Sequence, residues 1–351
     1  MISSTMDQTI KRLVRPNILN LAPYTCARNE YTGEARAWLD ANENSLIDGL
    51  NRYPDPLQLK VKERLAELRG VPADNIFLGV GSDECIDLCY RVFCCPGKDN
   101  VVAIDPTYGM YKVCADINDV EYRPVDLNPD YSIDVDRLLA ATDPDTKVIW
   151  ICSPNNPTGN AFPPATLEEV ARRFDGITVI DEAYVDFSPH GSMVSRIAAY
   201  PRMIVMQTFS KAWAAAAMRL GIAFASRDII TLFNNVKYPY NINILTQREA
   251  LRLLDKAGEV KETAERLVEL RKTLAAELLT LNAVKAVYPS DANFLLVKVD
   301  DANRLYDYLK EEGVIVRNRS RVNLCDGSLR ITVGNPDENS LLLEKIKQYG
   351  G

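Results

Sequence analysis

The sequence predicts an α/β protein whose larger domain has a mostly parallel, covered sheet and whose smaller domain is α+β. Between residues 75 and 225, short apolar runs rich in β-branched residues alternate with stretches of helical length. Apolar strands that alternate with helices are typical of a parallel sheet covered on both faces. Beyond about residue 240 the chain is charge-rich and free of proline as far as residue 281. This change in composition indicates that the chain beyond about residue 240 forms a second domain with a different architecture.

Individual elements follow from the local patterns. Apolar runs predict strands at 76–80, 101–104, 147–152, 177–180, 203–206 and 221–224. A helix is expected over 166–174, with Thr166 as its cap and two glutamates near the positive end of its dipole. Leucines near helical spacing predict one or two long helices over 241–281. The remaining chain predicts strands at 294–299, 314–317 and 329–333, a helix at 303–311 and a last helix from Asp337.

These elements suggest a division of the chain into three parts. Residues 1–40 are expected to form an N-terminal arm that joins the small domain. Residues 41–240 form the large domain, and residues 241–351 form the small C-terminal domain. A chain of 351 residues is long enough for one large core and a second, smaller one.

The charge balance argues against polyanionic partners. Lys and Arg number 41 against 48 Asp and Glu, a formal net charge of -7, so neither nucleic acid nor an anionic membrane is an expected partner. A small anionic substrate would therefore need a local cluster of arginine or lysine. The first sixteen residues lack the apolar core of a secretory signal, and the most apolar stretch, near 213–225, is interrupted by Arg219. We therefore expect a soluble, cytoplasmic protein.

Histidine and cysteine usage narrows the chemistry. His190 is the one histidine, which excludes multi-histidine zinc sites and leaves a Ser-His-Asp triad only if this turn residue supplies the base. No metal is expected, and His190 is interpreted as a turn residue without a role. The eight cysteines contain no C-x-x-C pair, so they are interpreted as small buried apolar residues in a reducing compartment.

Two motifs place ionisable groups after apolar strands. Lys211 follows the strand at 203–206 within Thr208-Phe209-Ser210-Lys211, where a desolvated amine could form a Schiff base, although most such lysines are merely solvated. Asp181 ends the strand at 177–180 and precedes Glu182-Ala183-Tyr184. Ligands of an open α/β sheet bind at the carboxyl ends of its strands. A buried aspartate there needs a cationic partner, such as a protonated pyridine nitrogen; the alternative is a helix cap.

Two further motifs could position polar groups at the same sheet edge. Asn156 lies in the turn Ser153-Pro154-Asn155-Asn156-Pro157-Thr158-Gly159, which could hold its amide toward a ring oxygen or be no more than a loop. Gly79-Val80-Gly81-Ser82-Asp83 leads from a strand into a helix, and free amides at a helix N-terminus can bind phosphate. The signal is weak by itself because the third glycine of the dinucleotide fingerprint is absent.

Together these motifs provide, in chain order, a phosphate cradle, an amide for a ring oxygen, an acid for a pyridinium and a lysine for an aldehyde. The chain therefore resembles the fold-type I pyridoxal-phosphate (PLP) enzymes of the aminotransferase family. Further strings nearly end to end resemble its histidinol-phosphate aminotransferase branch, namely Pro23-Tyr24, Asp40-Ala41-Asn42-Glu43-Asn44, Asn51-Arg52-Tyr53-Pro54-Asp55, Pro106-Thr107-Tyr108-Gly109-Met110-Tyr111, Ser290-Asp291-Ala292-Asn293-Phe294 and Leu329-Arg330-Ile331-Thr332-Val333-Gly334.

The resemblance implies a fold-type I architecture with a mostly parallel seven-stranded sheet, and it implies roles for residues of this chain. Lys211 would bind the cofactor aldehyde and shuttle a proton, with Asp181 and Tyr184 as the other catalytic residues. Asp181 would pair with the pyridinium nitrogen, Tyr184 and Asn156 would hydrogen-bond the phenolic oxygen, and Tyr108 would stack on the ring. The cofactor phosphate would contact Ser82, Asp83, Thr208, Ser210, Arg219 and, from the partner subunit of a homodimer, Tyr53.

The implied reaction moves an amino group between L-histidinol phosphate and 2-oxoglutarate, giving imidazole acetol phosphate and L-glutamate, a step of histidine biosynthesis. One site must then accept a carboxylate in one half-reaction and a phosphate in the other. Arg330 and Arg317 could bind both anions, since a guanidinium fork matches either, with Tyr24 beside them and Asn156 also touching substrate. The competing interpretation of Arg317 is an exposed loop residue crowded by Arg319 and Arg321.

Two departures and three alternatives accompany the resemblance. Ala215 and Ala217 stand near the phosphate site, where the family commonly has leucine and glycine, so the added methyl group of Ala217 could crowd the backbone there. Ser45 replaces the usual proline after Asn42-Glu43-Asn44, which loosens one turn and leaves the chemistry untouched. The alternatives are a decarboxylase of a phosphorylated amino acid, an aminotransferase for aromatic or aliphatic amino acids, and a protein that binds PLP or an effector only as a sensor.

Overall fold

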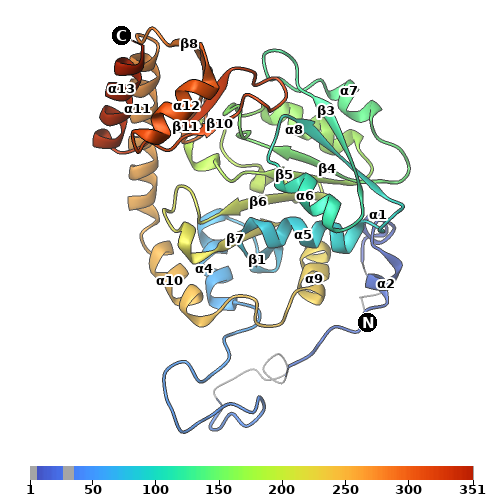
Figure 1. Cartoon of the computed structure of the whole chain (residues 1–351). Helices are drawn as coiled ribbons and strands as arrows, with labels where there is room; N and C mark the ends of the chain where they lie inside the picture. The colour runs from blue at the N-terminus through green and yellow to red at the C-terminus, as the bar shows by residue number, and fades with distance from the viewer. Residues whose placement is uncertain (1–5, 27–34, 351) are drawn as a thin grey trace.

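The protein contains a large sheet and a small sheet with helices packed around both (Figure 1). The computed structural model describes residues 6–26 and 35–350. The large sheet has seven strands in the order β1-β7-β6-β5-β4-β2-β3, and the small sheet has four in the order β10-β11-β9-β8. This confirms the expected α/β fold class with its seven-stranded sheet.

The large sheet is parallel over most of its width. Strands β6, β5, β4, β2 and β3 pair in parallel, whereas β7 runs antiparallel to both β6 and β1. The strands are β1 (Ile76–Val80), β2 (Asn100–Asp105), β3 (Glu121–Asp126), β4 (Thr146–Cys152), β5 (Ile177–Asp181), β6 (Met203–Thr208) and β7 (Leu220–Phe224). Six of them were expected; β1 has the expected bounds, and the bounds of the other five differ by one or two residues.

Helices connect these strands and cover both faces of the sheet. The helices of this part are α4 (Leu59–Arg69), α5 (Gly81–Phe93), α6 (Met110–Ile117), α7 (Val135–Ala140), α8 (Pro164–Arg173), α9 (Arg227–Val236) and α10 (Ile244–Leu254). Short 3-10 turns lie at η1 (Ala73–Asn75), η2 (Val185–Phe187), η3 (Met193–Arg196) and η4 (Ala216–Met218).

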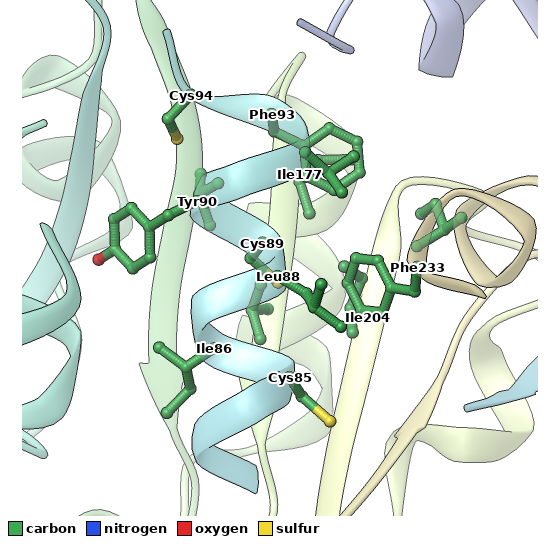
Figure 2. Packing of buried hydrophobic residues seen from close by; sticks show 14 of the residues in the cluster. Cys85, Ile86, Leu88, Cys89, Tyr90, Phe93, Cys94, Ile177, Ile204 and Phe233 are labelled. Carbon is green, nitrogen blue, oxygen red and sulfur yellow. The ribbon is translucent and has the colours of Figure 1, made fainter. Parts of the chain in front are cut away.

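Alternating strand residues divide the core into two layers. In β1, Phe77 points into the layer around α5 and α9, while Ile76 and Leu78 belong to the layer on the other face. Figure 2 shows the first layer, where α5 packs Leu88 and Phe93 near Ile177 and Phe233. Because side chains alternate across a strand, fully apolar strands of this kind supply both layers at once.

The small sheet lies over the carboxyl-terminal helices. Its strands are β8 (Val284–Val287), β9 (Phe294–Val299), β10 (Arg317–Asn318) and β11 (Ser328–Thr332), all paired antiparallel. Helices α11 (Ala257–Leu278), α12 (Ala302–Glu311) and α13 (Pro336–Tyr349) complete this unit. Their apolar faces form a separate core with Leu274, Leu305 and Leu342.

The described part of the N-terminal arm corrects one expectation. Helices α1 (Gln8–Lys11) and α2 (Pro16–Leu19) pack against the large sheet's layer, not against the small sheet (Figure 1). Ile10 and Ile18 are buried in the core that contains α5, and the Arg15 amide donates to the Val92 carbonyl at 2.9 Å. The assignment of residues 1–40 to the small domain is therefore wrong for these helices, because their apolar side chains are buried against α5.

Several local expectations also differ from the structure. Helix α8 begins at Pro164 after Pro163, so Thr166 lies inside the helix and is not its cap. The strand expected at 314–317 overlaps the two-residue strand β10 only at Arg317, and strands β3 and β8 were not expected. Helix α10 packs Ala250 and Leu254 into the large core, so the packing change falls after α10 and not at residue 241.

The described residues contain neither a candidate membrane-spanning helix nor a candidate metal-binding cluster. No helix in this part of the chain combines the length and apolar character needed to cross a membrane. Within the same residues, no group of three His, Cys, Asp or Glu side chains is arranged to hold a metal ion. The eight cysteines are unpaired, and all except the partly exposed Cys95 are buried.

Candidate active site

The carboxyl ends of the parallel strands meet at one edge of the large sheet, and a pocket of about 150 Å³ lies there. Strand β5 ends at Asp181 beside the end of β4 at Cys152, and β6 ends two residues before Ser210. Ten of the eleven expected cofactor-binding residues line this pocket, namely Ser82, Asp83, Tyr108, Asn156, Asp181, Tyr184, Thr208, Ser210, Lys211 and Arg219.

Asp181 is the buried acid of the pocket, with 2% of its surface exposed. One carboxylate oxygen, Oδ2, accepts a hydrogen bond from the Tyr111 hydroxyl at 2.7 Å, and the other accepts from the Ala183 amide at 3.1 Å. Burial raises the pKa of Asp181 to about 6, although both hydrogen bonds oppose the shift. A buried carboxylate without a cationic partner is costly, so this group favours a ligand that brings a positive charge.

Lys211 lines the same pocket from the loop after β6. Its Nζ lies 5.6 Å from the centre of the Tyr184 ring. Partial burial and the positive charges of Arg330 and Arg219 lower the pKa of Lys211, against the opposing effect of Asp181. A lowered pKa increases the fraction of neutral amine, the form that attacks an aldehyde and accepts a proton.

Arg330 of the small sheet contacts Asn156, a pocket residue in the loop after β4. The Arg330 Nη1 atom on β11 donates to the Asn156 Oδ1 atom at 2.6 Å. The Arg330 guanidinium also lies 5.4 Å from the centre of the Phe294 ring, and that ring packs edge-on against Tyr184. A guanidinium over an aromatic face is held by the ring's quadrupole, so Arg330 is positioned from two sides.

The start of α5 and the end of β6 form the other end of the pocket. The Arg219 Nη2 atom contacts the Asp83 carboxylate at 3.1 Å, and its Nη1 atom donates to the Ser210 hydroxyl at 3.4 Å. Gly81 at the start of α5 has a φ of 69°, and a Cβ there would lie 2.6 Å from the Arg219 Nη2 atom. Only glycine therefore allows the guanidinium to lie across this helix start.

Tyr108 and Tyr111 approach the pocket from the segment after β2. Tyr108 donates to the Asp83 carboxylate at 3.3 Å, and its ring meets Tyr111 edge-on at 5.6 Å. Tyr111 is completely buried and stacks on Trp150 with ring centres 4.8 Å apart. The sequence analysis named Tyr108 but gave Tyr111 no role, since the motif alone does not reveal which tyrosine reaches Asp181.

A second buried acid lies directly beside the first. Glu182 accepts hydrogen bonds from the Ser192 hydroxyl, the Met193 amide and the Gln207 side-chain amide at 2.5, 2.6 and 2.9 Å. Burial raises the pKa of Glu182 to about 7 despite these donors. Its contacts connect the segment after β5 to strand β6.

Three arginines gather on the small-sheet side. Arg317 on β10 pairs across the ladder with Arg330 on β11, and their charges join burial in lowering the pKa of the half-buried Arg319. The ion pairs found among the described residues include none of these three side chains. A group of guanidinium ions without a carboxylate is suited to an anionic ligand. Arg319 was treated only as a crowding neighbour in the sequence analysis.

Five residues of the sequence analysis lie outside the pocket. Tyr53 is half-exposed and stacks on Tyr240 at 4.4 Å, and it is not among the pocket residues. Tyr24 is 73% exposed and also does not line the pocket. His190 is an exposed loop residue. Of the two unusual alanines, Ala217 is exposed and Ala215 packs against the large core.

The pocket also contains residues that the sequence analysis did not single out as pocket-lining. These are Cys152, Ala183 and Ala216. Cys152 pairs with Asp181 in the sheet, Ala183 follows Asp181 by two residues, and Ala216 precedes Arg219 by three. Closeness to the motif residues is therefore the signal that could have identified them.

The sheet order and the pocket at its carboxyl edge define the class of fold-type I enzymes. A family model described as "Aminotransferase class I and II" matches residues 17–346. The chain belongs to the class I and II aminotransferase family. It is 51% identical over 345 residues to a histidinol-phosphate aminotransferase of Bacteroides thetaiotaomicron, an alignment that covers 98% of this chain and all of that protein.

Solved structures agree with the fold. A histidinol-phosphate aminotransferase from Clostridium acetobutylicum has a TM-score of 0.79 at 24% identity, covering 86% of this chain and 91% of that one. One from Sinorhizobium meliloti, in complex with pyridoxal-5'-phosphate, has a TM-score of 0.79 at 20% identity and covers 98% of both chains. At these identities the likeness concerns the fold.

Proposed function

We propose that the protein binds PLP in this pocket and transfers an amino group between L-histidinol phosphate and 2-oxoglutarate. The observation that carries the proposal is that Lys211 and the buried Asp181 line one pocket, while Arg330 donates a hydrogen bond to Asn156, another residue of that pocket. They do so in a chain 51% identical over nearly its whole length to a relative of that name. The proposal places the protein in histidine biosynthesis.

The donors at the phosphate end suit a phosphate dianion. Ser82, Thr208 and Ser210 supply hydroxyl groups, Arg219 supplies a guanidinium, and the first amides of α5 point out of the helix. A helix N-terminus attracts anions through its free amides and its dipole. A Cβ on Gly221 would lie 2.2 Å from the Ser82 amide nitrogen, so the missing side chain lets β7 approach the cradle closely.

The donors at the ring end suit a protonated pyridine that carries a phenolic oxygen. Asp181 lacks a cationic partner among the described residues and would gain one from the ring nitrogen. We assign Asn156 and Tyr184 to the phenolic oxygen and Tyr108 to the ring face. Burial raises the pKa of Tyr184, so its hydroxyl stays protonated and can donate.

PLP, when bound, supplies an aldehyde that joins to amines and a ring that withdraws electrons from the substrate carbon. Lys211 would hold the cofactor at its aldehyde, and its Nζ atom would carry the proton that leaves the substrate carbon. Asp181 would favour a positive charge on the ring nitrogen. Tyr184 and Asn156 would orient the ring oxygen, and the phosphate donors would hold the cofactor in place.

Arg330 and Arg317 are assigned to the substrate anion. Glutamate presents a carboxylate and histidinol phosphate presents a phosphate, and a guanidinium can donate two parallel hydrogen bonds to either. Arg330 is half-buried, which strengthens its interaction with an anion relative to an exposed charge. Tyr24 is assigned to the same subsite only within the assembled enzyme, since it is 73% exposed in the protomer.

We further propose a homodimer in which Tyr53 reaches the phosphate of the partner's cofactor. The segment before Tyr53 carries exposed apolar side chains, with Leu46 exposed by 93% and Leu50 by 64%. Large apolar side chains that are exposed on one segment favour a protein interface, and the position of Tyr53 outside the pocket of its own protomer supports donation across that interface. The buried, unpaired cysteines support a reducing compartment such as the cytoplasm.

Tyr53→Phe is expected to weaken PLP retention about tenfold, because one hydrogen bond to a charged phosphate is lost. The dissociation constant of PLP measures this, with Tyr238→Phe, an exposed tyrosine, as the matched control. Mixed dimers of a Tyr53→Phe chain with a Lys211→Ala chain should contain one intact site. If no site in the mixed dimer regains wild-type PLP affinity, Tyr53 does not cross the interface.

A spectrophotometric half-reaction tests the function. The PLP form should lose its visible absorbance when L-histidinol phosphate is added alone, releasing one equivalent of imidazole acetol phosphate, and 2-oxoglutarate should restore it with formation of glutamate. A higher kcat/KM with phenylalanine would instead favour an aromatic aminotransferase. Release of carbon dioxide from a phosphorylated amino acid would favour a decarboxylase, and absence of PLP absorbance would reject the whole proposal.

A further inference from the structure

The hydrogen bond between Tyr111 and Asp181 has a consequence for the protonation of the cofactor ring. Within the described part of the chain, Asp181 has two hydrogen-bond donors and no ion-pair partner. One donor is a backbone amide, which substitution leaves in place. The other is the Tyr111 hydroxyl at 2.7 Å, so Tyr111 is the side chain through which the protein adjusts the charge of this carboxylate.

Tyr111 is held rigidly in that position. Its ring is completely buried and stacks nearly parallel on Trp150, at an interplanar angle of 13°. Its backbone carbonyl accepts a hydrogen bond from the Tyr90 hydroxyl at 2.7 Å, and Tyr108 packs edge-on against its ring. Burial raises the pKa of the Tyr111 phenol, so the group remains a donor over the whole range in which the enzyme works.

We propose that Tyr111 is a positioning residue that keeps Asp181 ionised and thereby keeps the pyridine nitrogen of bound PLP protonated. The inference rests on the proposed function, because it concerns the same cofactor. A hydrogen bond donated to a carboxylate stabilises its charged form and lowers its affinity for a proton. With Tyr111 in place, the proton shared by Asp181 and the ring nitrogen stays on the nitrogen.

Loss of the hydroxyl moves that proton in the opposite direction. Asp181 lies in an environment that already disfavours its charge, and one of its two donors would be gone. The carboxyl group then takes the proton from the ring nitrogen, which leaves a neutral acid beside a neutral pyridine. No other bond forms or breaks. The cofactor loses its charge contact and part of its affinity.

The test uses the holoenzyme reconstituted with PLP labelled with nitrogen-15 in the ring. The chemical shift of that nitrogen distinguishes pyridinium from pyridine. Tyr111→Phe is expected to move the signal toward neutral pyridine and to raise the dissociation constant of PLP about tenfold. Tyr131→Phe is the matched control, because it removes the hydroxyl of a buried tyrosine that bonds the Leu324 carbonyl and does not line the pocket. Its nitrogen shift should equal that of the wild type.

Two further measurements separate an electrostatic effect from a structural one. In an Asp181→Asn background, Tyr111→Phe should produce no additional nitrogen shift, since the charged acceptor is gone. If Tyr111→Phe does not fold, 3-fluorotyrosine at position 111, a stronger donor of nearly equal size, should tighten PLP binding, and unchanged affinity there would count against the inference.

The outcomes are distinguishable from a failure of the proposed function. If the wild type binds no PLP, the proposed function fails and the ring has no signal to assign. If the wild type shows a pyridinium and Tyr111→Phe shows the same shift, the function stands and the role of Tyr111 is overturned. A shift that Tyr131→Phe reproduces would also overturn it, because the cause would then be a general loosening of the packing.

Discussion

Replacing Lys211 with alanine is expected to lower kcat by about 10,000-fold or more, with PLP still bound through its phosphate and ring contacts. Lys211 is the one lysine that lines the pocket of the described chain, so no neighbouring amine can take over its proton transfer. The visible absorbance that arises when the Lys211 amine is joined to the cofactor aldehyde should disappear in the same variant. Stopped-flow half-reactions with glutamate and with histidinol phosphate measure the loss.

Two controls accompany this variant. Lys298→Ala removes an exposed lysine from β9 and should leave both half-reactions at the wild-type rate. Lys211→Arg keeps the positive charge but lacks a neutral amine at neutral pH, so it should be nearly as inactive as the alanine variant. If the alanine variant kept its visible absorbance, the cofactor would be attached elsewhere. With retained absorbance, the experiment would also no longer distinguish an enzyme from a protein that binds PLP only as a sensor.

Arg330→Ala is expected to lower kcat/KM in both half-reactions by about 30- to 1,000-fold, which corresponds to roughly 2 to 4 kcal/mol. The substitution removes a partner of the substrate anion and leaves the Asn156 Oδ1 atom without its 2.6 Å donor. The loss should be shared by glutamate and histidinol phosphate, because one guanidinium serves both anions. Steady-state kinetics with each substrate measure it.

The chain offers a close control for this prediction. Arg321→Ala removes an exposed arginine from the loop between β10 and β11 and should change neither half-reaction. Arg330→Lys keeps the charge without the planar fork, so we expect an intermediate loss. Unchanged kinetics of Arg330→Ala with both substrates would show that another group binds the anion, and Arg319 would be the next residue to replace.

The strands that carry the site could be predicted because they are buried on both faces. The runs at β4, β5 and β6 are apolar on both faces, so they are expected in the interior of a sheet. The motif residues lie where these runs end. Strand β3 was missed because it is an edge strand whose exposed side chains include Glu121 and which contains Pro124. Periodicity and apolar content are weak signals for such strands.

The contacts between distant segments could not be predicted from motifs. Nothing in the order of residues indicates that Tyr111, 70 positions away, donates to Asp181, or that Arg319 stands beside the other two arginines of the small sheet. The N-terminal helices were assigned to the wrong sheet for the same reason. Their apolar residues predict burial, but only the folded chain shows that the cover lies beside α5.

The neighbouring buried acids Asp181 and Glu182 link cofactor loading to the proton balance of folding. Their ordinary pKa values of 3.8 and 4.5 rise to about 6 and about 7 in the folded chain without cofactor. At pH values between the ordinary and the raised pKa of each acid, the folded chain binds more protons than the unfolded chain. The free energy of unfolding of the folded chain therefore falls as the pH rises from about 4 past 7. A positively charged cofactor ring beside Asp181 stabilises the ionised carboxylate, so Asp181 no longer contributes to this fall in the free energy of unfolding. The cofactor thus acts as a folding ligand, and its stabilising effect is largest at mildly alkaline pH.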